Sequence, residues 1–320
     1  MKYQLPCTVF YLCMFLIMIG CGKKSEQVNR DLSQAESINI VSTTSMIGDL
    51  AANIGGQRVA VKTLMGPGID PHLYKASQRD VIILADADII FFNGLHLEGA
   101  MSEVLEQMET FGITMAVAGN IPEEKLISPK EFSRAHDPHI WFDVQLWSYA
   151  VEAVYQTLAK LDSAHIDIYK KNFERYQAEL EQLHEYVLHE SAKIPENIRV
   201  LITAHDAFNY FGRAYGFEVR GLQGISTASE AGTADVQNLA SFIVERKIPA
   251  IFIESSVPQR NIEAVQAAVA ARDFEVVIGG ELFSDSMGDK NTPEGNYIGM
   301  VKHNVNMIVA ALIGPGSNLE

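Results

Sequence analysis

The chain has 320 residues, of which 48% are hydrophobic and 20% are charged, and its net charge is −15 at pH 7. The length suits two globular units with separate cores, and the composition excludes an intrinsically disordered chain. The acidic balance argues against binding to nucleic acid, which needs a basic surface.

The N-terminus has the pattern of an export signal. Lys2 precedes an apolar run whose uninterrupted part, from Val9 to Ile19, is 11 residues long. That is too short for a membrane-spanning helix but suits the core of a signal peptide. The run ends at Gly20-Cys21, which resembles a bacterial lipobox, where the cysteine is acylated after cleavage. We therefore predict a signal peptide over 1–20, lipidation at Cys21 and a polar tether over 21–37, with a plain signal anchor as the alternative.

The first half of the body alternates between strand and helix patterns. Strands are expected at 38–43, 58–64, 88–92 and 113–116, and helices at 45–54, 78–85 and 98–111. Alternation of this kind predicts a parallel sheet covered by helices. We assign 38–162 to an N-terminal α/β lobe.

A long helical pattern follows. From His165 to Lys193 there is no Gly or Pro, and apolar residues recur in steps of four and three, as one face of a helix requires. Such a helix would be about 40 Å long and stiff. We predict a rigid connecting helix over 163–194, with a helical hairpin or a coiled-coil arm for dimerisation as the alternative.

The second half repeats the same alternation, with strands expected at 199–203, 217–221, 250–253 and 275–278 and helices at 236–246, 260–271 and 297–312. We assign 195–320 to a C-terminal α/β lobe. The predicted fold class is therefore α/β, with two lobes, each a mainly parallel sheet flanked by helices, joined by one long rigid helix.

Two of the nine histidines lie in identical tripeptides, Asp70-Pro71-His72 and Asp137-Pro138-His139. The proline restricts the backbone just before each imidazole, which favours a rigid loop. The aspartate two residues earlier is a candidate hydrogen-bond partner that orients the ligand nitrogen. Two matched copies indicate a paired ligand role.

Two further candidates lie in the second half. His205 stands at the carboxyl end of a predicted strand, where open α/β sheets place their ligands. Asp285 lies in the loop after the last predicted strand; alone it would be read as a turn or cap residue. Three imidazoles and one carboxylate form a ligand set suited to zinc, manganese or iron.

Taken in order, several motifs resemble the zinc/manganese solute-binding proteins of bacterial ABC importers, the cluster A-I or cluster 9 family. These motifs are Gly66-Pro67-Gly68-Ile69-Asp70-Pro71-His72-Leu73-Tyr74, Asn93-Gly94-Leu95, Asp137-Pro138-His139-Ile140-Trp141-Phe142-Asp143, Thr203-Ala204-His205-Asp206-Ala207-Phe208 and Leu282-Phe283-Ser284-Asp285-Ser286. The resemblance covers about 38–312.

The resemblance implies metal bound in a cleft between two lobes, with His72 and His139 as N-lobe ligands and His205 and Asp285 as C-lobe ligands. It also implies delivery of the metal to an ABC permease with its ATPase. Many manganese-dedicated members have glutamate where this chain has His205, and many zinc-dedicated members carry a His-rich loop where Gly119 to Ala135 has none. We therefore expect Zn2+ or Mn2+ as the transported ligand, with Fe2+ as a further candidate.

Other functions are weighed against this interpretation. A metal-dependent enzyme needs an open coordination position, and the best remaining acid/base candidate is Glu254, whose plainer role is to orient a neighbouring loop. A surface adhesin would not need a buried four-ligand set. We expect an exported, lipid-anchored monomer, with His96, His136 and Trp141 outside the ligand set. Because imidazoles bind metal in the neutral form, affinity is expected to fall as pH drops through about 6.5.

Overall fold

The computed structural model describes residues 32–128 and 135–314. The predicted signal peptide, Cys21 and the tether as far as residue 31 lie outside the described residues. Where the description begins, Leu32 is already buried, and its N–H donates to the Leu161 carbonyl at 2.8 Å. The end of the expected tether therefore lies against the body. Within the described part of the chain, no helix has both the length and the apolar character needed to cross a membrane.

The N-terminal half is built on a four-stranded parallel sheet with strand order β2-β1-β3-β4. Its strands are β1 (Ile38–Ser42), β2 (Val59–Thr63), β3 (Ile89–Phe92) and β4 (Ile113–Ala116), and helices α1 (Ser45–Gly55), α2 (Gln78–Ala85) and α3 (Ser102–Met108) lie between them in the chain. Strand β1 is central, with Ile40 beside Val61 on one side and Ile89 on the other. A parallel strand covered on both faces is apolar almost throughout, which matches the run Ile38-Asn39-Ile40-Val41.

The C-terminal half contains two parallel strand pairs, β5 with β6 and β7 with β8, and β5 lies beside β7. The strands are β5 (Val200–His205), β6 (Glu218–Gln223), β7 (Ala250–Glu254) and β8 (Val277–Leu282). The helices of this half are α6 (Asn209–Tyr215), α7 (Thr233–Arg246), α8 (Arg260–Ala270) and α9 (Tyr297–Ile313). Parallel strands flanked by helices in both halves confirm the predicted fold class.

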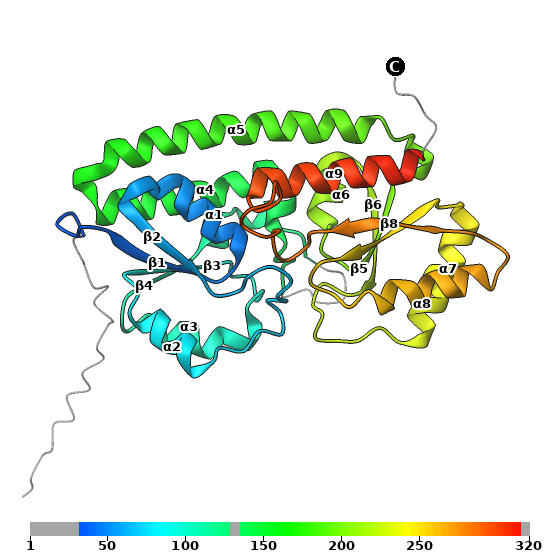
Figure 1. Ribbon diagram of the computed structural model, residues 1–320, viewed down its shortest axis with the longest axis horizontal. Helices are drawn as coiled ribbons and strands as arrows, with labels where there is room; N and C mark the ends of the chain where they lie inside the picture. The colour runs from blue at the N-terminus through cyan, green and yellow to red at the C-terminus, as the bar shows by residue number, and fades with distance from the viewer. Residues whose placement is uncertain (1–31, 129–134, 315–320) are drawn as a thin grey trace, which may run out of the picture.

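Two helices follow one another between the two sets of strands, and the second of them joins the halves. Helix α4 (Val144–Leu161) begins at Asp143, whose carboxylate accepts hydrogen bonds from two N–H groups of the first turn. Helix α5 (Ile166–Ala192) is 27 residues long, about 40 Å at the usual rise, and runs along both halves (Figure 1). The predicted long connecting helix is thereby confirmed, whereas helix α4 occupies residues 144–161, where no element is predicted.

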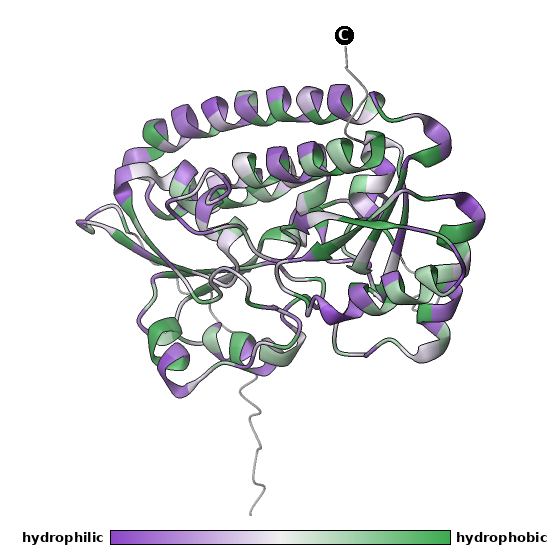
Figure 2. Ribbon diagram, turned by 45° about the vertical axis from the view of Figure 1, so that its right-hand side comes forward, coloured by the Kyte–Doolittle hydropathy of each residue, from purple (hydrophilic) through white to green (hydrophobic). Residues whose placement is uncertain are grey.

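Helix α5 is held by one buried stripe. Its apolar residues pack on α1 and α4 in the first half and on α6 and α9 in the second, and its outer face is hydrophilic (Figure 2). The buried residues of this stripe are Tyr169, Tyr176, Leu180, Leu183 and Val187. Because the stripe is covered within the chain, it does not require the second copy that a coiled-coil arm would.

Helix α3 is shorter than expected. The pattern over 98–111 predicts one helix, but a 3-10 turn occupies Gly99–Met101 and the α-helix covers only Ser102–Met108. Gly94, Leu95 and His96 precede it with φ values of 83°, 53° and 63°. Two non-glycine residues in this left-handed region are uncommon, and the tight turn is closed by the Leu97 N–H, which donates to the Gly94 carbonyl at 3.1 Å.

Asp49 links three helices at the junction of the halves. Its Oδ2 accepts the N–H of Tyr297 at the start of α9 at 3.1 Å and the hydroxyl of Tyr176 on α5 at 3.5 Å. Burial raises the pKa of Asp49 from 3.8 to about 6, although the hydrogen bond from Tyr297 opposes the shift. The ionised carboxylate is therefore an unfavourable component of the folded state at neutral pH.

The sign of this effect can be tested with Asp49→Asn, which keeps an acceptor for Tyr297. The contribution of Asp49 to folding is fully present below pH 3.8 and is lost as pH rises through about 6. We expect the variant to unfold with a free energy higher than wild type by about 1–3 kcal/mol at pH 8, and the gain to disappear near pH 4. Urea unfolding at the two pH values measures this, with the exposed Glu245→Gln as charge control. A variant less stable than wild type at pH 8 would contradict the assignment.

Candidate metal centre

The four residues singled out in the sequence converge at one point where the two halves meet. His205 is the last residue of β5, and Asp285 follows β8 by three residues. His72 lies in the loop that follows β2, and His139 lies in the segment between β4 and α4. Open parallel sheets bind ligands beyond the carboxyl ends of their strands, and each half contributes two groups there.

The spacing of the facing atoms fits a small cation. His72 Nε2 lies 3.3 Å from His139 Nε2, and Asp285 lies 3.5 Å from His139 Nε2 and 3.4 Å from His205 Nε2. One ligand atom from each of the four residues can be chosen so that all lie within 4.8 Å of one another. For a tetrahedral ion with bonds of about 2.0–2.1 Å, the ligand atoms are about 3.3 Å apart. Three of the pairs already match this distance.

Burial leaves these atoms few partners other than one another: in the described part of the chain, only Asp285 Oδ2 accepts a further hydrogen bond, from Ser256 Oγ at 3.1 Å. His139 and His205 have no exposed surface, Asp285 is 1% exposed and His72 is 7% exposed. Among the described residues, Asp285 Oδ1 has no hydrogen-bond partner, and His205 Nε2 has only its ion pair with Asp285 Oδ2. Buried polar atoms are normally paired, and an unpaired set that converges on one point is what a cation site requires.

Carboxylates behind two of the imidazoles orient them. Asp137 Oδ1 lies 2.7 Å from His139 Nδ1 and accepts the His139 backbone N–H at 3.0 Å. Glu254 does the same for His205, with Oε2 at 2.6 Å from Nδ1 and Oε1 accepting the backbone N–H at 2.8 Å. When Nδ1 is held from behind, Nε2 is the nitrogen that faces the centre.

The charges of the group are strongly coupled. Burial lowers the pKa of His72 to about 3, so this imidazole is neutral at pH 7. Burial acts in the same direction on His205, but the carboxylates of Glu254 and Asp285 outweigh it and raise its pKa well above 6.5. Burial would also raise the pKa of Asp285, yet the three imidazoles hold it well below its usual range. Without a bound cation, these carboxylates therefore favour the protonated form of His205, paired with the ionised Asp285.

Access to the centre is easiest beside His72, the most exposed of the four. The neighbouring side chains Ile69 and Leu73 are 40% and 53% exposed, so the loop that carries His72 is itself at the surface. The other three groups lie deeper.

Trp141, Glu254, His96 and His136, which the sequence places outside the ligand set, have the following positions. Trp141 is buried behind the centre, where its Nε1 donates to the Ser284 carbonyl at 3.0 Å, next to Asp285. Glu254 orients His205. His96 is exposed, and His136 pairs with Ser128 at 3.0 Å.

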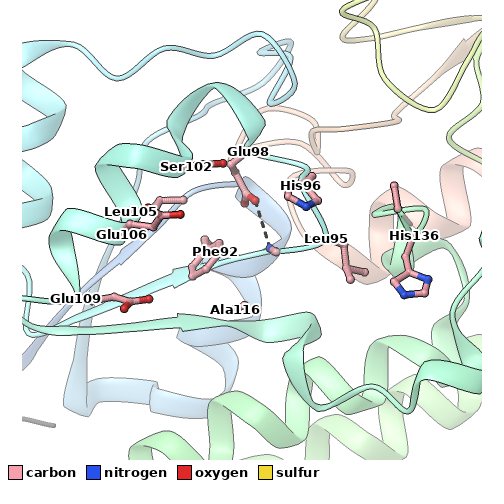
Figure 3. A pocket seen from close by; sticks show the side chains of 12 residues that line it. Phe92, Leu95, His96, Glu98, Ser102, Leu105, Glu106, Glu109, Ala116 and His136 are labelled. Carbon is pink, nitrogen blue, oxygen red and sulfur yellow. Dashed lines mark hydrogen bonds between the residues drawn. The ribbon is translucent and has the colours of Figure 1, made fainter. Parts of the chain in front are cut away.

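His96 and His136 instead line a separate pocket of about 470 Å3 in the N-terminal half (Figure 3). Glu98 at its edge accepts the Gly94 N–H at 3.3 Å, and its other oxygen accepts from Asn93 and Thr43. Asn93 in turn donates to the Pro138 carbonyl at 2.9 Å, just before His139. None of the four converging residues lines this pocket.

Two polar contacts at the centre are not predicted from the sequence. Asn209 donates to Asp137 Oδ2 at 3.1 Å, and Thr227 donates to Asp70 Oδ2 at 2.6 Å. Both connect residues far apart in the chain, and no motif marks either donor. His205-Asp206-Ala207-Phe208 points only to the neighbourhood of Asn209.

Fold and site together define a two-lobed α/β protein with a buried three-histidine, one-aspartate centre between its lobes. The chain belongs to the family described as "Zinc-uptake complex component A periplasmic", whose model matches residues 40–311. It is 53% identical to the zinc-binding protein TroA of Treponema pallidum over 273 residues, which cover 85% of this chain and 88% of TroA. It is 46% identical to the manganese-binding lipoprotein MntA of Bacillus subtilis over 295 residues, which cover 92% of this chain and 95% of MntA.

Solved structures agree with this membership. The periplasmic zinc-binding protein TroA of T. pallidum superposes with a TM-score of 0.84 at 52% identity, covering 86% of this chain and 99% of that structure. Fe(III)-bound YtgA of Chlamydia trachomatis superposes with a TM-score of 0.77 at 27% identity, covering 87% of this chain and 99% of that structure.

The charge state predicts proton release on metal binding. A cation that takes Nε2 of His205 must displace its proton, whereas His72 is already neutral. We expect about one proton to be released from His205 for each Zn2+ bound at pH 7.5. We also expect the affinity for Zn2+ to start falling at a higher pH than the protonation of an ordinary histidine would cause. Titration calorimetry in buffers of different ionisation enthalpy measures this release.

The matched variant is Glu254→Gln, which removes the carboxylate that keeps His205 protonated. Proton release at pH 7.5 is expected to fall in this variant, and the exposed Glu263→Gln is the control. Equal release from wild type and Glu254→Gln would contradict the charge assignment.

Proposed function

We propose that the chain captures a divalent transition metal, zinc and/or manganese, with His72, His139, His205 and Asp285, and delivers it to an ABC permease. The observation that carries this proposal is the convergence of four buried groups, two from each half, with spacings of 3.3–3.5 Å and a carboxylate oxygen, Asp285 Oδ1, that has no hydrogen-bond partner among the described residues. The family membership supports it, since members of this family serve metal uptake.

The donor set supports more than one metal. Three imidazoles and one carboxylate oxygen make the tetrahedral set that zinc prefers. Asp285 has one oxygen near His139 and the other near His205, so both can face the metal and give manganese or Fe2+ a fifth donor. The names of the two relatives are divided in the same way, since TroA is called zinc-binding and MntA manganese-binding.

A closed centre suits capture more than catalysis. Catalytic zinc sites keep a coordination position open for water, whereas four protein groups surround this one and leave at most 7% of any of them exposed. Solute capture accounts for the four groups without requiring a reaction.

Release is expected to depend on the permease. Helix α5 runs along both halves without interruption, so a wide hinge motion would strain it. We propose that docking on the permease, driven by its ATPase, shifts His205 and Asp285 away from the N-terminal half by a small displacement.

Export and anchoring complete the proposal. We propose a signal peptide over 1–20, a lipid on Cys21, a tether from there to residue 37, an N-terminal lobe over 38–162, a connecting helix over 163–194 and a C-terminal lobe over 195–320. The word lipoprotein in the name of MntA supports the anchor. A monomer is sufficient, because all four groups come from one chain.

The proposal is tested on the soluble body, from residue 22 onward, by metal analysis and competitive titration. We expect one equivalent of metal in wild type and its loss in His72→Ala and His205→Ala. The order of divalent ions in nitrogen and oxygen sites predicts tighter binding of Zn2+ than of Mn2+. His189→Ala, on the exposed face of α5, is the control. Absence of metal and of any thermal shift with either ion would overturn the proposal.

A further inference from the structure

The two Asp-Pro-His tripeptides share an arrangement that crosses the boundary between the halves. In each, one carboxylate oxygen accepts the backbone N–H of the histidine, at 2.8 Å for Asp70 with His72 and 3.0 Å for Asp137 with His139. The other oxygen accepts a side-chain donor from the C-terminal half. The donor is Thr227 for Asp70, at 2.6 Å, and Asn209 for Asp137, at 3.1 Å.

These carboxylates control the position of the imidazoles. Each holds the main chain at its histidine, and Asp137 also holds His139 Nδ1 at 2.7 Å. Hydrogen bonds to a carboxylate are stronger than those between neutral groups, and a carboxylate held at both oxygens cannot rotate. Asp137 has no exposed surface and Thr227 is 8% exposed, whereas Asn209 and Asp70 are half-buried, so each of the two bonds has one well-buried partner.

Both donors are attached to the segment that carries His205. Asn209 begins α6, four residues after His205. Thr227 lies in the loop after β6, and this loop is tied to the same place because Asp206 N–H donates to the Gly224 carbonyl and Gly221 N–H donates to Asp206. A displacement of the end of β5 therefore moves Asn209 and Thr227 together with His205.

We propose that Asn209 and Thr227 are positioning residues that make the orientation of His72 and His139 depend on contact between the two halves. When the two halves are in contact, Thr227 and Asn209 donate to Asp70 and Asp137, and the two imidazoles are held rigidly. Separation withdraws His205 and Asp285 and at the same time frees Asp70 and Asp137, which loosens the two imidazoles that remain. Metal release is thereby concerted, and a small displacement suffices. This inference rests on the proposed function.

A plainer role would be adhesion between the halves, and other bonds across the boundary serve as comparison. The Met287 N–H donates to Ser45 Oγ at 2.9 Å without touching either aspartate. If adhesion alone mattered, loss of the Ser45 bond would accelerate metal release as much as loss of the Thr227 bond. If positioning matters, the effect of Thr227 passes through Asp70.

The test measures the rate at which Zn2+ leaves the soluble body into excess chelator, by stopped flow. Thr227→Val and Asn209→Leu keep size but remove the donor, and each is expected to speed dissociation about tenfold, the lower end of what loss of a group supporting a metal ligand costs. Thr227→Ser, which restores the hydroxyl, and Ser45→Ala are expected to dissociate close to the wild-type rate.

A double-mutant cycle identifies the route of the effect. In an Asp70→Ala background, Thr227→Val is expected to change the dissociation rate no further, because the acceptor is already absent. Additive effects in this cycle, or equal effects of Thr227→Val and Ser45→Ala, would overturn the inference while leaving metal capture intact. A wild-type protein that binds no Zn2+ would instead overturn the proposed function.

Discussion

The structure depends on one electrostatic constraint, which is that a buried carboxylate and three buried imidazoles must share a single small space. Buried charges are costly unless they are paired, and in the metal-free protein Asp285 is paired with the imidazolium of His205. The pair leaves other atoms, among them Asp285 Oδ1, without a partner. A divalent cation pairs with all of these groups at once, which accounts for four such residues being buried together.

The scaffold fixes the distance between the two sources of these groups. Helix α5 runs the length of both halves, and Asp49 joins α1, α5 and α9 at their junction. Apolar packing along α5 restricts how far the halves can part. The centre therefore lies between elements whose relative position is nearly fixed, and small movements of the strand ends control it. His205 is oriented by Glu254, which belongs to the same half. The aspartates that orient His72 and His139 instead accept hydrogen bonds from side chains of the other half.

Much of this arrangement was predictable from the sequence, because local patterns determine it. Alternating strands and helices predicted the fold class, and the helical stripe from Tyr169 to Val187 predicted α5. The repeated Asp-Pro-His tripeptides, with His205 and Asp285, named the four residues that converge. The donors Asn209 and Thr227 could not be found in this way. Asn209 is separated from its acceptor by 72 positions in the sequence, and Thr227 from its acceptor by 157 positions. Only tertiary structure brings such pairs together. Helix α4 is not predicted although Asp143 caps its start, and α3 is shorter at both ends than its sequence pattern predicts.

The central claim is that one cation is held by groups from both halves. X-ray absorption spectroscopy of the Zn2+-loaded soluble body, compared with Asp285→Ala and His139→Ala, tests it most directly. The account predicts nitrogen and oxygen neighbours at about 2.0–2.1 Å with scattering from three imidazole rings in wild type, and one ring fewer in His139→Ala. Spectra with fewer than three imidazoles in wild type, or spectra unchanged by both substitutions, would contradict it.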